Sequence, residues 1–149
     1  MKDRSRKKWL KKHGKYINPK DAWNLYYKIA EYVLPRLQLF KKKNNGYPSF
    51  GEVDTPEKWD AILDKMIVAF EYLVDDDNWW LNNKEYDYTD GLYIRSEPTE
   101  KPGLHKLVID EEDWVAEIRK AHDEEEQRRN KVIEEGLELF AKYFRHLWW

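Results

Sequence analysis

The chain has 149 residues, the size of one domain with a substantial hydrophobic core, and its net charge at pH 7 is only −2. It contains no cysteine, which excludes disulfides, thiolate metal sites and cysteine nucleophiles. No segment approaches the roughly 18 apolar residues of a membrane span, and no apolar stretch follows the basic N-terminus as it would in a secretion signal. We therefore expect a single domain over residues 1–149 that acts in the cytoplasm, away from membranes.

Charge is distributed unevenly along the chain. Residues 1–45 carry 14 Lys and Arg against 3 Asp and Glu, whereas residues 46–149 carry 13 against 26. We expect residues 1–17 to be a basic, flexible N-terminal tail, or one that pairs with the acidic remainder or with a second copy in a homo-oligomer. The alternative is that its cations bind nucleic-acid phosphates, although the acidic body would repel a duplex. The candidate residues for this alternative are Arg4, Arg6, Lys7, Lys8, Lys11 and Lys12.

A first helix is predicted over about residues 19–44. Asn18 is a favourable cap, and Pro19 suits the first turn because its missing N–H has no partner there. Pro35 lies inside the pattern and predicts a kink rather than an end. Apolar residues recur every three or four positions and define one face: Trp23, Tyr26, Tyr27, Ala30, Val33, Leu34, Leu37 and Phe40. Four more widen this face toward a second contact: Leu25, Ile29, Tyr32 and Leu39.

A second helix is predicted over residues 56–74, started by Thr55 and Pro56 and carrying a continuous apolar face. Residues 75–110 then lose the helical period and mix aromatic residues with Asn, Asp, Gly and Pro, so we expect an irregular excursion. Within it, the short runs Leu92–Arg95 and Leu104–Ile109 are predicted to pair as a small β-hairpin.

A third helix is predicted over residues 111–147. Its apolar face is interrupted between Arg119 and Lys131, but this stretch contains neither Pro nor Gly, which favours one long helix over two. The sequence therefore predicts a mainly α protein, a small bundle of three main helices with the irregular segment attached. Trp23, Trp59 and Trp114 are in phase with the apolar faces, so we expect them in the core.

The chain has more aromatic residues than a core of this size needs, with 8 Trp, 10 Tyr and 5 Phe. Four tryptophans fall outside the periodic faces or at their ends, and they either cap the bundle or contact another molecule. Trp and Tyr dominate interface hot spots, and the same rings stack on nucleic-acid bases. We predict partner contacts at these four and at two arginines of the charged arm 119–131: Trp79, Trp80, Trp148, Trp149, Arg128 and Arg129.

Two carboxylate pairs, Glu57 with Asp60 and Glu135 with Glu138, have the i, i+3 spacing by which all-α nucleotide pyrophosphohydrolases hold magnesium. The two motifs occur in the reverse order of that family, and about seventy-five residues separate them. A solvated helix face is therefore the favoured interpretation, and a Mg²⁺ site is the alternative; otherwise no cofactor is expected. We find no phosphate loop, nucleophile elbow or zinc spacing, and predict no catalytic residue.

Several short stretches resemble a group of small uncharacterised proteins encoded in bacteriophage genomes. The resemblance covers both ends and the second helix, and leaves residues 75–110 largely uncovered. It implies a phage protein acting in the cytoplasm of a bacterial host, and it carries over no catalytic residue. The stretches are Asp21-Ala22-Trp23-Asn24-Leu25, Pro35-Arg36-Leu37, Gly46-Tyr47-Pro48, Trp59-Asp60-Ala61-Ile62-Leu63, and Gly136-Leu137-Glu138-Leu139-Phe140 with the terminal Leu147-Trp148.

These observations favour a small phage-encoded helical protein that works by binding another protein, in a way that modulates a host protein or defence system. One alternative is a nucleotide-binding protein, either a sponge for a nucleotide signal or a Mg²⁺-dependent nucleotide hydrolase. The other is a nucleic-acid binder that uses the basic N-terminus.

Overall fold

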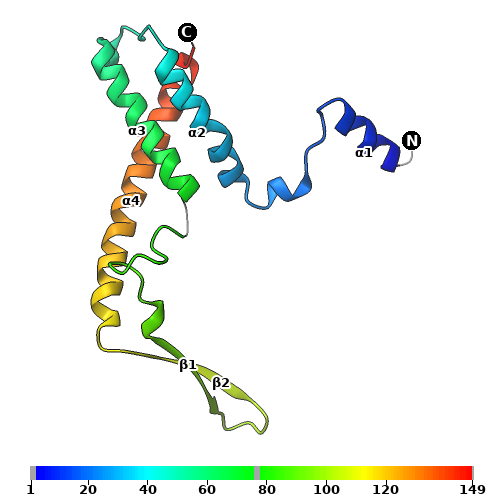
Figure 1. Cartoon of the computed structure of the whole chain (residues 1–149), viewed down its shortest axis with the longest axis vertical. Coiled ribbons are helices and arrows are strands. Elements are labelled where there is room, and N and C mark those ends of the chain that lie inside the picture. The colour runs from blue at the N-terminus through cyan, green and yellow to red at the C-terminus, as the bar shows by residue number, and fades with distance from the viewer. Residues whose placement is uncertain (1–2, 76–77, 149) are drawn as a thin grey trace.

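The computed structural model describes residues 3–75 and 78–148, and four α-helices and one small antiparallel sheet lie within these ranges. Helices α2 (Leu25–Lys43) and α3 (Pro56–Asp75) lie together with the C-terminal part of α4 (Val115–Tyr143), and the N-terminal part of α4 extends beyond them toward the hairpin (Figure 1). Helix α3 is the central one, because it packs on both α2 and α4. The prediction of a mainly helical chain with a small hairpin is confirmed.

The N-terminal segment corrects the predicted count of three helices. Within the predicted basic tail, residues 1–17, Asp3–Lys12 form helix α1, which stands away from the bundle on an extended link (Figure 1). An acidic residue in its first turn and lysines in its last turn suit the helix dipole. The rings of Trp9 and His13, one turn apart, also stack with their centroids 4.2 Å apart.

The bundle core forms where α3 meets its two neighbours. Because α3 and α4 run antiparallel, the start of α3 lies against the end of α4, and Trp59 meets Tyr143 edge-on with ring centroids 5.5 Å apart. Farther along, Phe70 meets Phe140 at 5.0 Å. The buried cluster comprises Ala30, Leu37, Val53, Trp59, Leu63, Met66, Ile67, Phe70 and Tyr143.

A glycine lets α3 and α4 approach closely. A Cβ added at Gly136 would lie 2.2 Å from the Cβ of Ala69 and 2.8 Å from the carbonyl oxygen of Lys65. No real side chain tolerates such distances, so the helices would have to separate. The absence of a side chain at Gly136 therefore sets the spacing of these two helices.

The predicted first helix begins later than expected. Asn18 caps a short 3₁₀ turn, Pro19–Ala22, by accepting a hydrogen bond of 3.1 Å from the backbone N–H of Lys20. The α-helix then starts at Leu25 and continues through Pro35 to Lys43. Its buried residues are only Ala30 and Leu37, because α2 contacts the bundle along one narrow side.

Two of the three tryptophans expected in the core are elsewhere. Trp59 is buried as predicted, but Trp23 is 94% exposed, because the α-helix that would have turned it inward has not yet begun at that residue. Trp114 is also partly exposed. Its ring instead covers Gly91, where an added Cβ would lie 2.6 Å from it, at the junction between the hairpin and α4.

The predicted hairpin is present and longer than expected. Strands β1 (Leu92–Pro98) and β2 (His105–Glu111) pair antiparallel, with Ile94 opposite Ile109 and Ser96 opposite Leu107. The face that carries these residues is exposed. The hairpin projects from the end of α4 that is opposite the chain's C-terminus (Figure 1).

Helix α4 begins at Val115 rather than near residue 111, because β2 extends to Glu111. It is one uninterrupted helix to Tyr143, as the lack of Pro and Gly in its polar stretch predicted, and a 3₁₀ turn, Phe144–His146, follows. Among the described helices, none is long and apolar enough to cross a membrane.

Candidate functional site

A groove lined mainly by apolar side chains lies between α2 and the C-terminal end of α4, and we call it the α2 groove. It has a volume of about 610 Å³. Most of its wall comes from α2, and the opposite side comes from α4 and the segment after it. The lining residues are Tyr32, Val33, Arg36, Leu37, Leu39, Phe40, Lys43, Phe140 and Leu147.

Large apolar side chains continue along α2 beyond the groove. Leu25, Ile29, Tyr32 and Leu39 are all exposed, and they follow one another at steps of four, three and seven residues. This is the spacing by which a helix presents one stripe to a partner helix. Since α2 packs on α3 through its other side, these four side chains stay about half exposed.

The far wall of the groove is held in place by ring contacts. Phe140 lies between Phe70 of α3, at 5.0 Å, and Phe144 of the terminal turn, at 5.4 Å, both edge-on. Phe144 is itself exposed. A rigid aromatic wall of this kind loses little entropy when a partner packs on it.

The charged groups of the groove are cations. Arg36 lies over the ring of Tyr32, with its guanidinium carbon 3.5 Å from the ring centroid, and Lys43 lies at the C-terminal end of α2. No acidic side chain is among the lining residues, and in the described ranges neither cation forms an ion pair with a carboxylate. Neighbouring Lys41 differs, because it pairs with Asp64 of α3.

A second pocket, of about 370 Å³, lies beside the loop that follows α3. The buried His122 is its centre: the ring of Trp79 stacks on it at 5.2 Å, and Trp80 and Tyr88 meet it edge-on at 5.1 and 5.6 Å. Two of the four tryptophans predicted to touch a partner, Trp79 and Trp80, are therefore half-buried against the protein's own histidine. The other lining residues are Tyr72, Glu126, Arg129, Asn130 and Ile133.

The loop that carries these tryptophans is fixed by Asp87. Its carboxylate accepts hydrogen bonds from the hydroxyl and N–H of Thr89, at 2.6 and 3.0 Å, and from the N–H of Asn82 at 3.1 Å. These donors stabilise the ionised form and lower the pKa of Asp87. The loop is consequently ordered without regular secondary structure.

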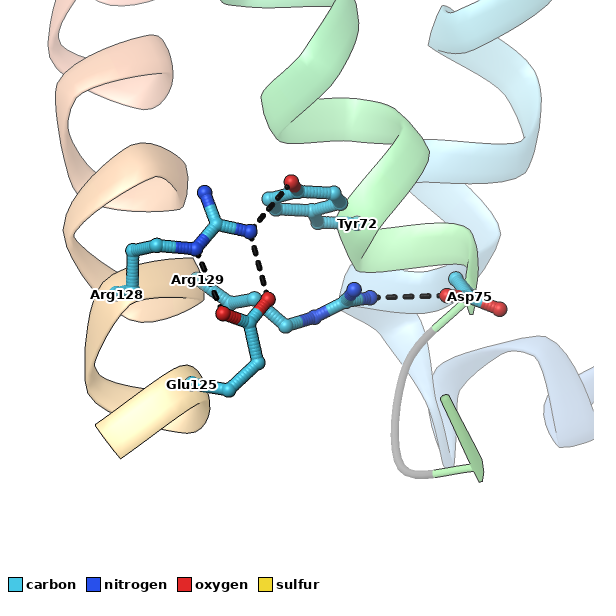
Figure 2. Close-up of polar contacts among 5 residues, drawn as sticks. All are labelled: Tyr72, Asp75, Glu125, Arg128 and Arg129. Atoms are coloured by element: carbon cyan, nitrogen blue, oxygen red, sulfur yellow. Dashed lines mark hydrogen bonds and ion pairs between the residues drawn. The ribbon is translucent and has the colours of Figure 1, made fainter. Parts of the chain in front are cut away.

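Arg128 and Arg129, predicted as partner contacts, are engaged within the molecule (Figure 2). Arg129 is mostly buried, donates to Asp75 at the end of α3 at 2.9 Å, and lies over the rings of Tyr72 and Trp79. Arg128 donates to both carboxylate oxygens of Glu125 and to the hydroxyl of Tyr72. This charge-assisted pairing lowers the pKa of Glu125.

Trp148 is exposed, next to Leu147 of the groove wall, and beside the loop of residues 44–50 that joins α2 to α3. Trp149 lies outside the described residues. Since Trp79 and Trp80 belong to the loop pocket at the other end of α3, the structure does not bring the predicted tryptophans into one surface. Their role as partner contacts stays a prediction.

The six cations predicted to contact nucleic acid all lie on α1, and in the described chain they have no carboxylate partner. Lys7 and Lys11 lie over the ring of Tyr16 in the link that follows, at 5.2 and 5.1 Å. The remaining four are Arg4, Arg6, Lys8 and Lys12.

The four carboxylates considered for Mg²⁺ do not gather. Glu135 pairs with Lys65, whereas Glu57 and Asp60 flank Trp59, which contacts Tyr143. Residue 143 is eight residues beyond Glu135, about 12 Å along the helix. Glu138 belongs to no ligand group either; where the structure describes the chain, the group within ligand distance is His122, Asp123 and Glu126.

Comparisons with known proteins give no further guidance. No family model matches the chain, and neither the curated proteins nor the solved structures contain a significant match. The resemblance to phage proteins therefore stays a prediction from the sequence.

Proposed function

We propose that this chain is a small phage-encoded protein that binds another protein through the α2 groove and so modulates a host protein or defence system in the bacterial cytoplasm. One observation carries the proposal: an apolar groove between α2 and α4 continues into an exposed apolar stripe of α2. Contiguous exposed apolar surface of this kind marks interaction sites in soluble proteins.

The shape of this surface favours a protein helix over a small molecule. From Leu25 to Leu39 the stripe spans fifteen residues, a rise of about 21 Å along the helix axis. That length suits three to four turns of an amphipathic helix, which would place its i, i+3, i+4 and i+7 side chains against the stripe and into the groove. A compact ligand would fill only the end near Phe140.

The test is affinity capture from host and phage-infected lysates with paired variants. Leu39→Asp places a charge in the groove. Leu104→Asp, in the hairpin turn, is the control, because the two leucines are almost equally exposed, 55% and 56%. We expect the wild type and Leu104→Asp to retain the same host protein and Leu39→Asp to lose it. Equal retention by both variants would contradict the proposal.

The loop pocket supports a second candidate function, nucleotide binding. Four aromatic rings surround it, those of Tyr72, Trp79, Trp80 and Tyr88, and rings of this kind stack on bases. Its lining holds one carboxylate, Glu126, and one cation, Arg129, so the lining offers a phosphate group no net positive charge. Mass spectrometry of small molecules retained in the same capture tests this candidate, and nucleotide release on Trp80→Ala would support it.

A further inference from the structure

The charged groups around the α2 groove indicate what kind of helix it accepts. We propose that the partner is an amphipathic helix whose apolar stripe is flanked by Asp and Glu. This inference rests on the proposed function, since it names the partner of the same groove.

The first argument is that no acidic side chain lines the groove. Two of its nine lining residues are cations, none is acidic, and Arg36 and Lys43 have no carboxylate partner in the described chain. A partner carboxylate beside these cations would gain charge-assisted hydrogen bonds, and a partner lysine would be repelled.

The second argument is the fixed orientation of Arg36. Its Nη1 donates a hydrogen bond of 2.7 Å to the carbonyl oxygen of Tyr32, and its plane is held over the ring of that residue. The remaining N–H groups of the guanidinium have no partner in the described chain, and they offer the planar fork that a carboxylate accepts bidentately. Because the side chain is already ordered, little further entropy is lost when a partner binds.

The third argument is the charge of α2 itself. Within Leu25–Lys43, five Lys and Arg stand against one acidic residue, Glu31. This excess would draw an acidic segment toward α2 and raise its association rate. A second copy of α2 fits less well, since its one carboxylate, Glu31, already pairs with Lys28 and is not free to meet the cations of the groove.

The experiment uses two designed helical peptides of about 20 residues with identical leucine stripes, one flanked by Glu and the other by Lys. Binding to the full chain is measured by fluorescence anisotropy at about 0.1 M salt and again at about 1 M, where the Debye length falls from about 10 to about 3 Å. We expect the Glu peptide to bind about tenfold more tightly at low salt, a preference that largely disappears at high salt.

Two variants locate the effect. The double charge reversal Arg36→Glu with Lys43→Glu should invert the preference between the peptides, whereas Lys106→Glu with Lys120→Glu, at exposed positions away from the groove, should leave it unchanged. Leu39→Asp should weaken the binding of both peptides.

The outcomes separate the two claims. Equal binding of both peptides, or tighter binding of the Lys peptide, would overturn the acidic-partner inference and leave groove binding intact. Failure of both peptides to bind would overturn the acidic-partner inference and the groove proposal together. A stable dimer in sedimentation that Leu39→Asp dissociates would do the same, since a second copy would then cover the groove.

Discussion

The guanidinium of Arg36 lies 3.5 Å from the ring centroid of Tyr32, one helical turn earlier, and the same guanidinium donates a hydrogen bond to the Tyr32 carbonyl oxygen. The pair places a cation beside an apolar stripe whose side chains are about half exposed. We expect Arg36→Ala to weaken partner binding several-fold and to change the free energy of unfolding by less than about 0.5 kcal/mol, because the site is exposed. Lys28→Ala, on the same helix but paired with Glu31, is the matched control for binding.

Gly136 provides a test of the bundle. Gly136→Ala should lower the free energy of unfolding by about 1–3 kcal/mol, because the new methyl group overlaps Ala69 and the Lys65 carbonyl. Gly46→Ala is the control, since a Cβ there meets no atom within 4 Å. Urea denaturation measures the free energy of unfolding of both variants. Equal midpoints for the two variants would mean that α3 and α4 are not so closely packed.

Two tryptophans should respond very differently to truncation. Trp59→Ala removes a side chain that is 1% exposed and should cost about 3–5 kcal/mol of stability. Trp23→Ala removes one that is 94% exposed and should change stability by less than about 0.5 kcal/mol. A large loss for Trp23→Ala would show that this ring is covered in solution.

The Glu125 and Arg128 pair predicts a pH dependence. Arg128 lowers the pKa of Glu125 below the ordinary 4.5, so the pair contributes stability above that pH and loses it as pH falls through the lowered value. Since Arg128 is half exposed, the contribution should stay below about 1 kcal/mol. Glu125→Gln should therefore be slightly less stable than the wild type at pH 7 and equal to it near pH 2. A difference in stability that persists near pH 2 would mean that Glu125 stabilises the protein through packing and not through its charge.

Helix α1 can be removed without harming the bundle, because it makes no substantial contact with the other described elements. Deletion of residues 1–16 should leave the melting temperature of the remainder unchanged. Any affinity for duplex DNA should be lost with this segment and should fall steeply with salt. DNA binding that survives the deletion would show that residues outside α1 contact the DNA.

Much of the fold could be predicted from local patterns. The continuous apolar face around Trp59 identified α3, and the absence of Pro and Gly in the polar stretch of α4 predicted one long helix. Helix α1 was missed because its ten residues have too few apolar positions for a periodic face, and its stability comes from charge placement and one ring pair. Trp23 was misplaced because its spacing fits a helix that begins only at Leu25.

The candidate site was only partly visible in the sequence. Leu25, Ile29, Tyr32 and Leu39 indicated a second contact face on the first helix, but the sequence could not show which face α3 would cover. The sequence predicted partner contacts at Trp79 and Trp80, but both rings pack on His122. This arrangement depends on the path of an irregular loop, which local patterns do not predict. Arg129 was predicted as a partner contact, but its guanidinium forms an ion pair with Asp75.

The central claim, that the α2 groove binds a partner, is tested most directly by photo-crosslinking in living cells that produce the chain. A benzoylphenylalanine in place of Leu39 should give a discrete adduct with one other protein, and the same group in place of Glu124, on the exposed polar part of α4, should not. Absence of an adduct at position 39, or an adduct whose mass is that of two copies of this chain, would contradict the account.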